Sequence, residues 1–151
     1  MGKILGLSHV GVYVRDLEKM AAFYRDVLGL AESRRDGERS VSLTSNKEVE
    51  DHEILLLAGR DGDARIIQQI SFRTGSVEDV KAFYDSFKRL GIPIHMAFSY
   101  GAGISCNVLD PEGNRVEIFA DVPGERETGY RGRLDLEKTA QELIAQVQGR
   151  E

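Results

Sequence analysis

The side chains best suited to metal binding or catalysis are three histidines and a single cysteine. His9 stands in an apolar, β-branched run that is typical of a buried strand, where a lone imidazole is either a hydrogen-bonded core residue or a metal ligand. We expect His52 at a surface strand edge and His95 at the start of a strand. Cys106 has no basic sequence neighbour that would lower its pKa, so we expect a packed, unreactive thiol.

An internal repeat organises the segments that must position these side chains. Ala22-Phe23-Tyr24 recurs as Ala82-Phe83-Tyr84, and Leu28-Gly29-Leu30 recurs as Leu90-Gly91-Ile92. Two further pairs of strand-like segments match, 7–14 with 67–74 and 54–58 with 116–120. The repeat indicates that two copies of one supersecondary unit make up most of the chain.

Each copy has the same local pattern. A β-branched run comes first, and apolar residues at helical spacing then follow Asp16 in one copy and Ser76 in the other, both good N-caps. Gly29 and Gly91 end these predicted helices, and three short strands separated by turn residues complete each copy. The pattern predicts an α+β fold of two tandem βαβββ modules, module one at 4–59 and module two at 66–120, within a single domain at 1–121.

The last residues, 122–151, have no counterpart in the repeat. Glycines and arginines up to Arg133 predict a loop or extended arm. An amphipathic helix should follow, because one apolar stripe contains Leu136, Ala140, Leu143, Ile144 and Val147. Either packing of the helix on its own chain or a dimer contact would bury that stripe.

Composition excludes several classes of function. The chain has 151 residues, enough for one domain, and no apolar run approaches the roughly 20 residues of a membrane span. Its net charge is −5 and its 20 Lys and Arg are scattered, so we expect neither a nucleic-acid nor a membrane partner. One cysteine and a start without a long apolar core indicate a cytoplasmic protein, and a small molecule is the expected ligand.

Two motifs carry a family resemblance. One runs from His9 to Val14 and on through Asp16-Leu17 to the segment Phe23 to Leu30, and the other from Asp110 to Glu117. Together they resemble the vicinal oxygen chelate superfamily, which includes glyoxalase I, fosfomycin and bleomycin resistance proteins, methylmalonyl-CoA epimerase and extradiol dioxygenases. The resemblance covers roughly residues 4 to 121 and is nearest to the small catechol 2,3-dioxygenase-like members. It implies that the two modules form a cupped mixed sheet.

The resemblance also implies a divalent metal held by His9, Gln69 and Glu117. A small set of ligands on one side of the ion leaves room for a substrate with two oxygen donors and for a third reactant. Fe(II) or Mn(II) would serve a dioxygenase, whereas Zn, Ni or Co would serve an isomerase. Tyr100, which stands where the dioxygenases have an acid/base histidine, is the candidate catalytic proton donor.

The chain departs from its relatives at several positions. Gln69 replaces the second histidine of the extradiol dioxygenases, and Asn107 stands where they often have a tyrosine. Glyoxalase I needs a carboxylate on the last strand of each module, but the repeat places Leu55 opposite Glu117. A shift in register could instead bring His52 and Glu53 to that position.

The resemblance and these departures are compatible with three functions. The first is a metal-dependent extradiol dioxygenase-like enzyme acting on a small vicinal-oxygen, aromatic substrate. The second is a glyoxalase- or epimerase-type isomerase or lyase, and the third is a metal-free binding protein like the bleomycin resistance proteins. The family resemblance also makes a homodimer the expected assembly. The predicted substrate-binding residues are Tyr13, Ser71, Arg73, Asn107 and Phe119.

Overall fold

The computed structural model describes residues 8–63, 67–101, 103–123 and 129–149. The chain divides into two compact units, Met1–Ala64 and Arg65–Glu151. The predicted start of module one at residues 4–7, the first residue of module two at 66, and part of the predicted arm at 124–128 lie outside the described residues. No helix in the described ranges is long and apolar enough to span a membrane.

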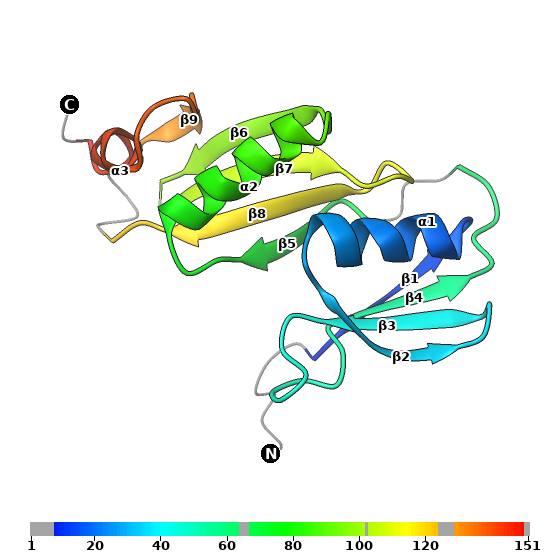
Figure 1. Ribbon diagram of the computed structural model, residues 1–151. Coiled ribbons are helices and arrows are strands. Elements are labelled where there is room, and N and C mark those ends of the chain that lie inside the picture. The colour runs from blue at the N-terminus through cyan, green and yellow to red at the C-terminus, as the bar shows by residue number, and fades with distance from the viewer. Residues whose placement is uncertain (1–7, 64–66, 102, 124–128, 150–151) are drawn as a thin grey trace, which may run out of the picture. The chain divides into compact units, whose positions relative to one another are not determined.

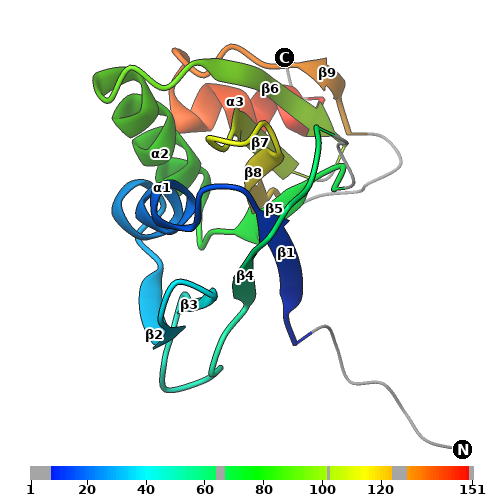
Figure 2. The same cartoon turned by 90° about the vertical axis from the view of Figure 1, so that its right-hand side faces the viewer.

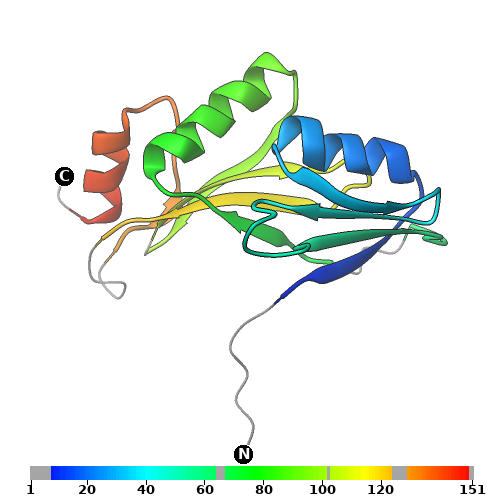
Figure 3. The ribbon, with the colours of Figure 1, turned by 60° about the horizontal axis from the view of Figure 1, so that its bottom comes forward.

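The first unit is a βαβββ module, as the repeat predicts. β1 (Val10–Val14) leads into α1 (Leu17–Ala22) and the π-helical turn η1 (Phe23–Val27). The remaining strands are β2 (Ala31–Asp36), β3 (Ser40–Thr44) and β4 (Ile54–Ala58). The strand order is β1-β4-β3-β2, with β1 parallel to β4 and the other pairs antiparallel. Within this unit α1 lies over one face of the sheet (Figure 3).

The second unit repeats the module and adds to it. β5 (Ile70–Arg73), α2 (Val77–Arg89), β6 (Ile94–Tyr100), β7 (Gly103–Leu109) and β8 (Arg115–Asp121) form the βαβββ pattern. The strand order is β5-β8-β7-β6-β9, and β5 runs parallel to β8 (Figure 1). The predicted α+β class and both modules are therefore confirmed, and each module builds a mixed sheet of its own.

Local signals start and stop the helices as predicted. The Asp16 carboxylate accepts a hydrogen bond from the Lys19 N–H, and the Ser76 hydroxyl accepts one from the Asp79 N–H. These bonds satisfy backbone donors that the first helical turn leaves without a partner. Gly91 follows α2 with φ +68°, a left-handed conformation that glycine adopts readily and that ends the helix.

The arm after β8 contains a strand that the sequence analysis did not predict. β9 (Arg131–Arg133) pairs antiparallel with Phe98–Tyr100 of β6 and extends the sheet (Figure 2). The predicted arm is therefore extended at these three residues, and what the sequence analysis did not predict is their pairing with β6. The physical reason is non-local, because the outer edge of β6 offers backbone hydrogen-bonding groups that no nearby sequence signal reveals.

The C-terminal helix packs on its own unit. α3 (Ala140–Val147) contacts α2 and β7, and Leu143 and Val147 on its apolar stripe are buried. Lys81 of α2 also donates hydrogen bonds to the backbone carbonyls of Leu136 and Lys138, at 2.7 and 2.6 Å. Of the two ways to bury the stripe, the structure shows intramolecular packing.

The face of the second sheet under α2 forms the apolar core of the unit. Ile104, Cys106 and Val108 of β7 lie beside Val116 and Ile118 of β8, and all five are buried. The buried face of α2 comprises Val77, Val80 and Phe87. Burial raises the pKa of the Cys106 thiol to about 12, because the charged thiolate loses its hydration there. The predicted packed position of Cys106 is confirmed.

Candidate functional site

The second sheet has a face opposite α2, which we call the open face. Side chains along a strand alternate between the two faces of a sheet. The buried apolar residues of β7 and β8, such as Cys106 and Ile118, have even numbers and lie toward α2, so the odd-numbered residues of these strands lie on the open face. The ladder pairs Ser71 of β5 with Glu117 of β8, and Glu117 with Asn107 of β7. These three polar residues therefore form one row across the centre of the sheet.

Glu117 is the buried acid of this row, with only 5% of its surface exposed. The Gln69 amide nitrogen and the Ser71 hydroxyl both donate to Glu117 Oε2, each at 2.6 Å. Glu117 Oε1 is buried and accepts no hydrogen bond from the described residues. A buried acceptor without a hydrogen-bond donor lowers the stability of the folded state by on the order of 1–3 kcal/mol, and by more when it is charged. A cation bound to Oε1 would offset this loss.

Asn107 is fully buried beside Glu117. Its amide nitrogen donates to Ser105 Oγ at 3.2 Å, and the Ser105 hydroxyl donates in turn to the Phe98 carbonyl at 3.1 Å. Asn107 Oδ1 is buried without a hydrogen-bond partner in the part of the chain that the structure describes. Ser105 was missed by the sequence analysis, although its spacing of two from Asn107 places both on one face of a strand.

Arg73 and Phe119 form a second row of the open face, paired with each other across β5 and β8. The Arg73 guanidinium lies 5.5 Å from the centroid of the Phe119 ring and forms an ion pair with Asp121. This arrangement presents a cation and an aromatic surface two residues along β8 from Glu117. Together with Ser71 and Asn107, four of the predicted substrate-binding residues share this face.

Two of the predicted site residues, His9 and Tyr13, belong to the first unit. β1 begins at Val10, whose N–H donates to the Glu53 carbonyl at 3.0 Å, so His9 stands exposed just before the strand. The expectation of a buried strand position for His9 was wrong, because the ladder starts one residue later. Tyr13 lies on β1 with 64% of its surface exposed.

His9 has a histidine neighbour that the sequence analysis assigned to the surface. The His9 and His52 rings lie with their centroids 4.2 Å apart, and only 14% of the His52 side chain is exposed. Asp51 Oδ2 lies 2.7 Å from His52 Nδ1, and this hydrogen bond holds the pKa of the Asp51 carboxyl below its ordinary value. The sequence signal that could have indicated a partly buried, hydrogen-bonded His52 is the carboxylate of Asp51 directly before it.

Comparison with known proteins places this geometry in a family. The model of the Glyoxalase/Bleomycin resistance protein/Dioxygenase superfamily matches residues 6–118. The chain belongs to this superfamily.

Three relatives show the range of the superfamily around this chain. The manganese-dependent 2,3-dihydroxybiphenyl 1,2-dioxygenase of Geobacillus genomosp. 3 is 30% identical over 123 residues, which are 80% of this chain but only 38% of the dioxygenase. The fosfomycin resistance protein FosX of Listeria monocytogenes is 29% identical over 84% of this chain and 98% of FosX. The fold is shared with lactoylglutathione lyase from Agrobacterium tumefaciens, with a TM-score of 0.66 and 23% identity over 78% of this chain and 95% of the lyase.

Within the superfamily, the strand register bears on a glyoxalase-like site with two carboxylates. β1 pairs Gly11 with Leu55 in the first unit, as β5 pairs Ser71 with Glu117 in the second. Leu55 is thus the structural equivalent of Glu117, and no shift of register brings Glu53 to that position. Among the described residues, no three or more His, Cys, Asp and Glu side chains are grouped so that they could hold a metal ion. A metal site in this member of the superfamily would therefore depend on amide oxygens as well.

Tyr100, the predicted proton donor, ends β6 with 47% of its surface exposed, and its ring lies 4.8 Å from that of Phe98. Met96 is the β6 residue level with Asn107, so Tyr100 is four residues further along the strand, roughly 13 Å at the usual rise. The structure does not bring Tyr100 into the row of Glu117 within the second unit.

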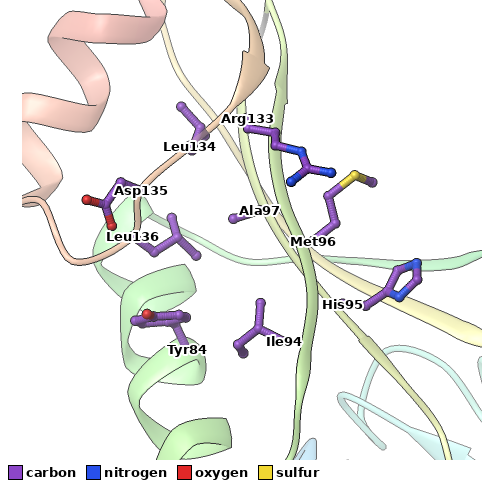
Figure 4. Close-up of a pocket in the computed structure, with 9 residues that line it drawn as sticks. All are labelled: Tyr84, Ile94, His95, Met96, Ala97, Arg133, Leu134, Asp135 and Leu136. Atoms are coloured by element: carbon purple, nitrogen blue, oxygen red, sulfur yellow. The ribbon is translucent and has the colours of Figure 1, made fainter.

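A cavity of about 270 Å³ lies at the edge of the second sheet. It is lined by Tyr84, Ile94, His95, Met96, Ala97, Arg133, Leu134, Asp135 and Leu136. Figure 4 shows His95, Met96 and Arg133 on one side of β6, and Ala97, Leu134 and Tyr84 on the other. None of the predicted site residues lines this cavity, so it is separate from the row around Glu117.

Proposed function

We propose that this chain is a divalent-metal-dependent, extradiol dioxygenase-like enzyme that acts on a small aromatic substrate with two adjacent oxygen atoms. The observation that carries the proposal is the buried Glu117 carboxylate, which keeps one oxygen without a partner among the described residues. The donor set fits a cation, because a carboxylate supplies charge and nearby neutral side chains supply oxygen ligands. The 30% identity to a manganese-dependent dioxygenase supports the choice of reaction.

The proposed ligands are His9, Gln69 and Glu117, with Fe(II) or Mn(II) as the ion. The bound ion would hold both substrate oxygens and mediate electron transfer from the substrate to dioxygen. Ser71 holds the Glu117 carboxylate in place through its hydrogen bond to Oε2. The Gln69 amide already lies beside that carboxylate, so a rotation of the amide would present its oxygen instead of its nitrogen.

Other residues of the open face would bind the substrate. The Phe119 ring offers an apolar surface for an aromatic ring, and the Arg73 guanidinium over it can pair with a negatively charged substrate oxygen. We propose Tyr100 as the proton donor. Because it ends β6 two residues beyond the level of Phe119, it would serve an oxygen of a substrate that extends from Glu117 across the Phe119 ring. Tyr100→Phe then lowers kcat and leaves the metal content unchanged, because only the phenol proton is removed.

Metal content is the first experiment. Protein without a histidine tag, purified under anaerobic conditions, should contain close to one equivalent of Fe or Mn by elemental analysis. His9→Ala and Glu117→Gln should each remove most of it. Asp121→Asn is the matched control, because Asp121 is a carboxylate on the same face of β8 that pairs with Arg73. Retention of metal in Glu117→Gln would refute the proposed site.

Oxygen uptake with catechols then tests the reaction. Consumption of oxygen in the presence of catechols by the metal-loaded protein, absent from Glu117→Gln, supports extradiol-type chemistry. Bound Zn, Ni or Co without oxygen uptake would instead favour an isomerase or lyase. Leu55 in the position equivalent to Glu117 argues against an isomerase that uses two carboxylates.

A metal-free binding protein is the second candidate, and one observation favours it. Gln69 and Ser71 donate to the Glu117 carboxylate in an arrangement that needs no metal for its Oε2 atom. A protein that takes up no metal after anaerobic addition of Fe(II) or Mn(II), yet binds small aromatic molecules in calorimetry, would establish this alternative.

We also propose that the chain acts as a homodimer. Because α3 already buries its apolar stripe within its own unit, the dimer would use another surface. Sedimentation equilibrium measures the mass directly, and a monomer at all concentrations would contradict the proposal.

A further inference from the structure

On adjacent strands of the open face, two buried side-chain oxygen atoms lack a hydrogen-bond partner among the described residues. Glu117 and Asn107 are ladder partners across β8 and β7, and their side chains project to the same side of the sheet. Each keeps a buried oxygen, Oε1 and Oδ1 respectively, that accepts no hydrogen bond within residues 8–63, 67–101, 103–123 and 129–149. A cation bound between two such oxygen atoms would accept their lone pairs and so take the place of the missing hydrogen-bond donors.

The orientation of the Asn107 amide is fixed by the neighbouring serine. The Ser105 hydroxyl has one proton, which it donates to the Phe98 carbonyl, so its oxygen can only accept from Asn107. Asn107 must therefore turn its nitrogen toward Ser105, at 3.2 Å, and its oxygen away from Ser105. Rotating the amide by half a turn would break one of these two hydrogen bonds.

The Glu117 carboxylate is oriented in a corresponding way from the other side. Both of its donors, Gln69 and Ser71, use Oε2, and this leaves Oε1 as the oxygen available to a further partner. The hydrogen bonds of Glu117 come from the β5 side and those of Asn107 from β7 and β6, so two independent networks each leave one oxygen available.

We propose that the side-chain oxygen of Asn107 is a further ligand of the divalent cation held by Glu117. The inference rests on the proposed function, and it gives Asn107 a role in metal binding instead of substrate binding. Carboxylate and amide oxygens are hard donors that suit Mn(II) better than Zn(II). With amide oxygens from both Asn107 and Gln69, the site should therefore favour Mn(II).

Two substitutions at position 107 test this. In calorimetric titration of metal-free protein with Mn(II), Asn107→Leu should bind the ion at least roughly ten-fold more weakly than the unchanged protein. Leucine is similar in size to asparagine but has no side-chain oxygen. Asn107→Asp keeps an oxygen and should bind at least as tightly as the unchanged protein. Met96→Leu is the matched control, since Met96 lies level with Asn107 on β6 and offers no oxygen ligand.

A second readout does not depend on activity. The Mn(II)-induced rise in melting temperature should be smaller in Asn107→Leu than in the unchanged protein, while Asn107→Asp and Met96→Leu retain it. Asn107→Ala replaces the leucine variant if the latter does not fold, with the same expectation.

The outcomes separate this inference from the proposed function. If the unchanged protein binds Mn(II) and Asn107→Leu binds it equally well, the role of Asn107 is refuted and the metal site stands. If leucine and aspartate weaken binding equally, Asn107 acts only through packing and the inference is also refuted. If the unchanged protein binds no Mn(II), the metal site and the role of Asn107 are both refuted.

Discussion

Glu117 and Asn107 are opposite each other in the β7–β8 ladder, each with a buried side-chain oxygen that lacks a partner among the described residues. The cost of such atoms is of the order of the net stability contributed by one or two ordinary hydrogen bonds. Two such atoms side by side, each oriented by its own hydrogen-bond network, are the physical basis of the proposed cation site.

Cys106 should be unreactive in the folded protein. Burial raises the pKa of its thiol to about 12, so almost none is thiolate at pH 8, and the surrounding core also excludes reagents. Dithionitrobenzoate should label no thiol in the native protein and one equivalent in guanidinium chloride. Rapid labelling of the native protein would show that β7 is not packed as described.

Leu143→Ala should destabilise the protein by about 2–5 kcal/mol, because it empties a fully buried position of α3 against its own unit. Urea unfolding measures the free-energy change, and Gln141→Ala, at an exposed position of the same helix, is the control. The mass in sedimentation should stay the same in both variants. A change in assembly without loss of stability would instead mean that α3 forms a subunit interface.

Thr139→Ala should cost about 1 kcal/mol of stability. Thr139 Oγ1 accepts from the Glu142 N–H at 3.3 Å, and Glu142 Oε2 accepts from the Thr139 N–H at 2.7 Å, which together form a capping box at the start of α3. Thr139→Ser retains the hydroxyl and should restore most of the loss. Equal losses in the two variants would show that the methyl group, not the cap, is what matters.

Glu137 should make stability depend on pH in the acid range. Hydrogen bonds from Lys88 and Tyr84 hold the pKa of its carboxyl below the ordinary 4.5. A lowered folded-state pKa means that the contribution is fully present above the ordinary pKa and is lost as pH falls through the folded-state pKa. Glu137→Gln should therefore melt earlier than the unchanged protein at pH 7, and the difference should shrink toward pH 3.

The effect at Glu137 should be small, because the group is exposed and salt screens it. Repeating the melts in 1 M salt should reduce the difference at pH 7. Glu38→Gln, in the β2–β3 turn, is the control at pH 7, because it also removes one exposed carboxylate but leaves the contacts of Glu137 with Lys88 and Tyr84 in place. A difference that grows as pH falls would contradict the assigned direction of the pKa.

The fold was largely predictable because its signals are local and occur twice. Helix caps at Asp16 and Ser76, glycines after the helices and short apolar strands all act within a few residues, and the repeat allowed each module to support the assignment of the other. β9 escaped prediction, because it forms only where the edge of β6 is available, far away in the sequence.

The candidate site divides in the same way. The sequence by itself determined the two βαβββ modules, and the family resemblance named Ser71, Asn107 and Glu117 among the expected site residues. Only the tertiary structure decided which oxygen atoms remain available, because that depends on how Gln69, Ser71 and Ser105 distribute their protons. Hydrogen bonds between strands far apart in the chain leave no periodic trace in the sequence, so their effect on Glu117 and Asn107 appears only when the sheet is assembled.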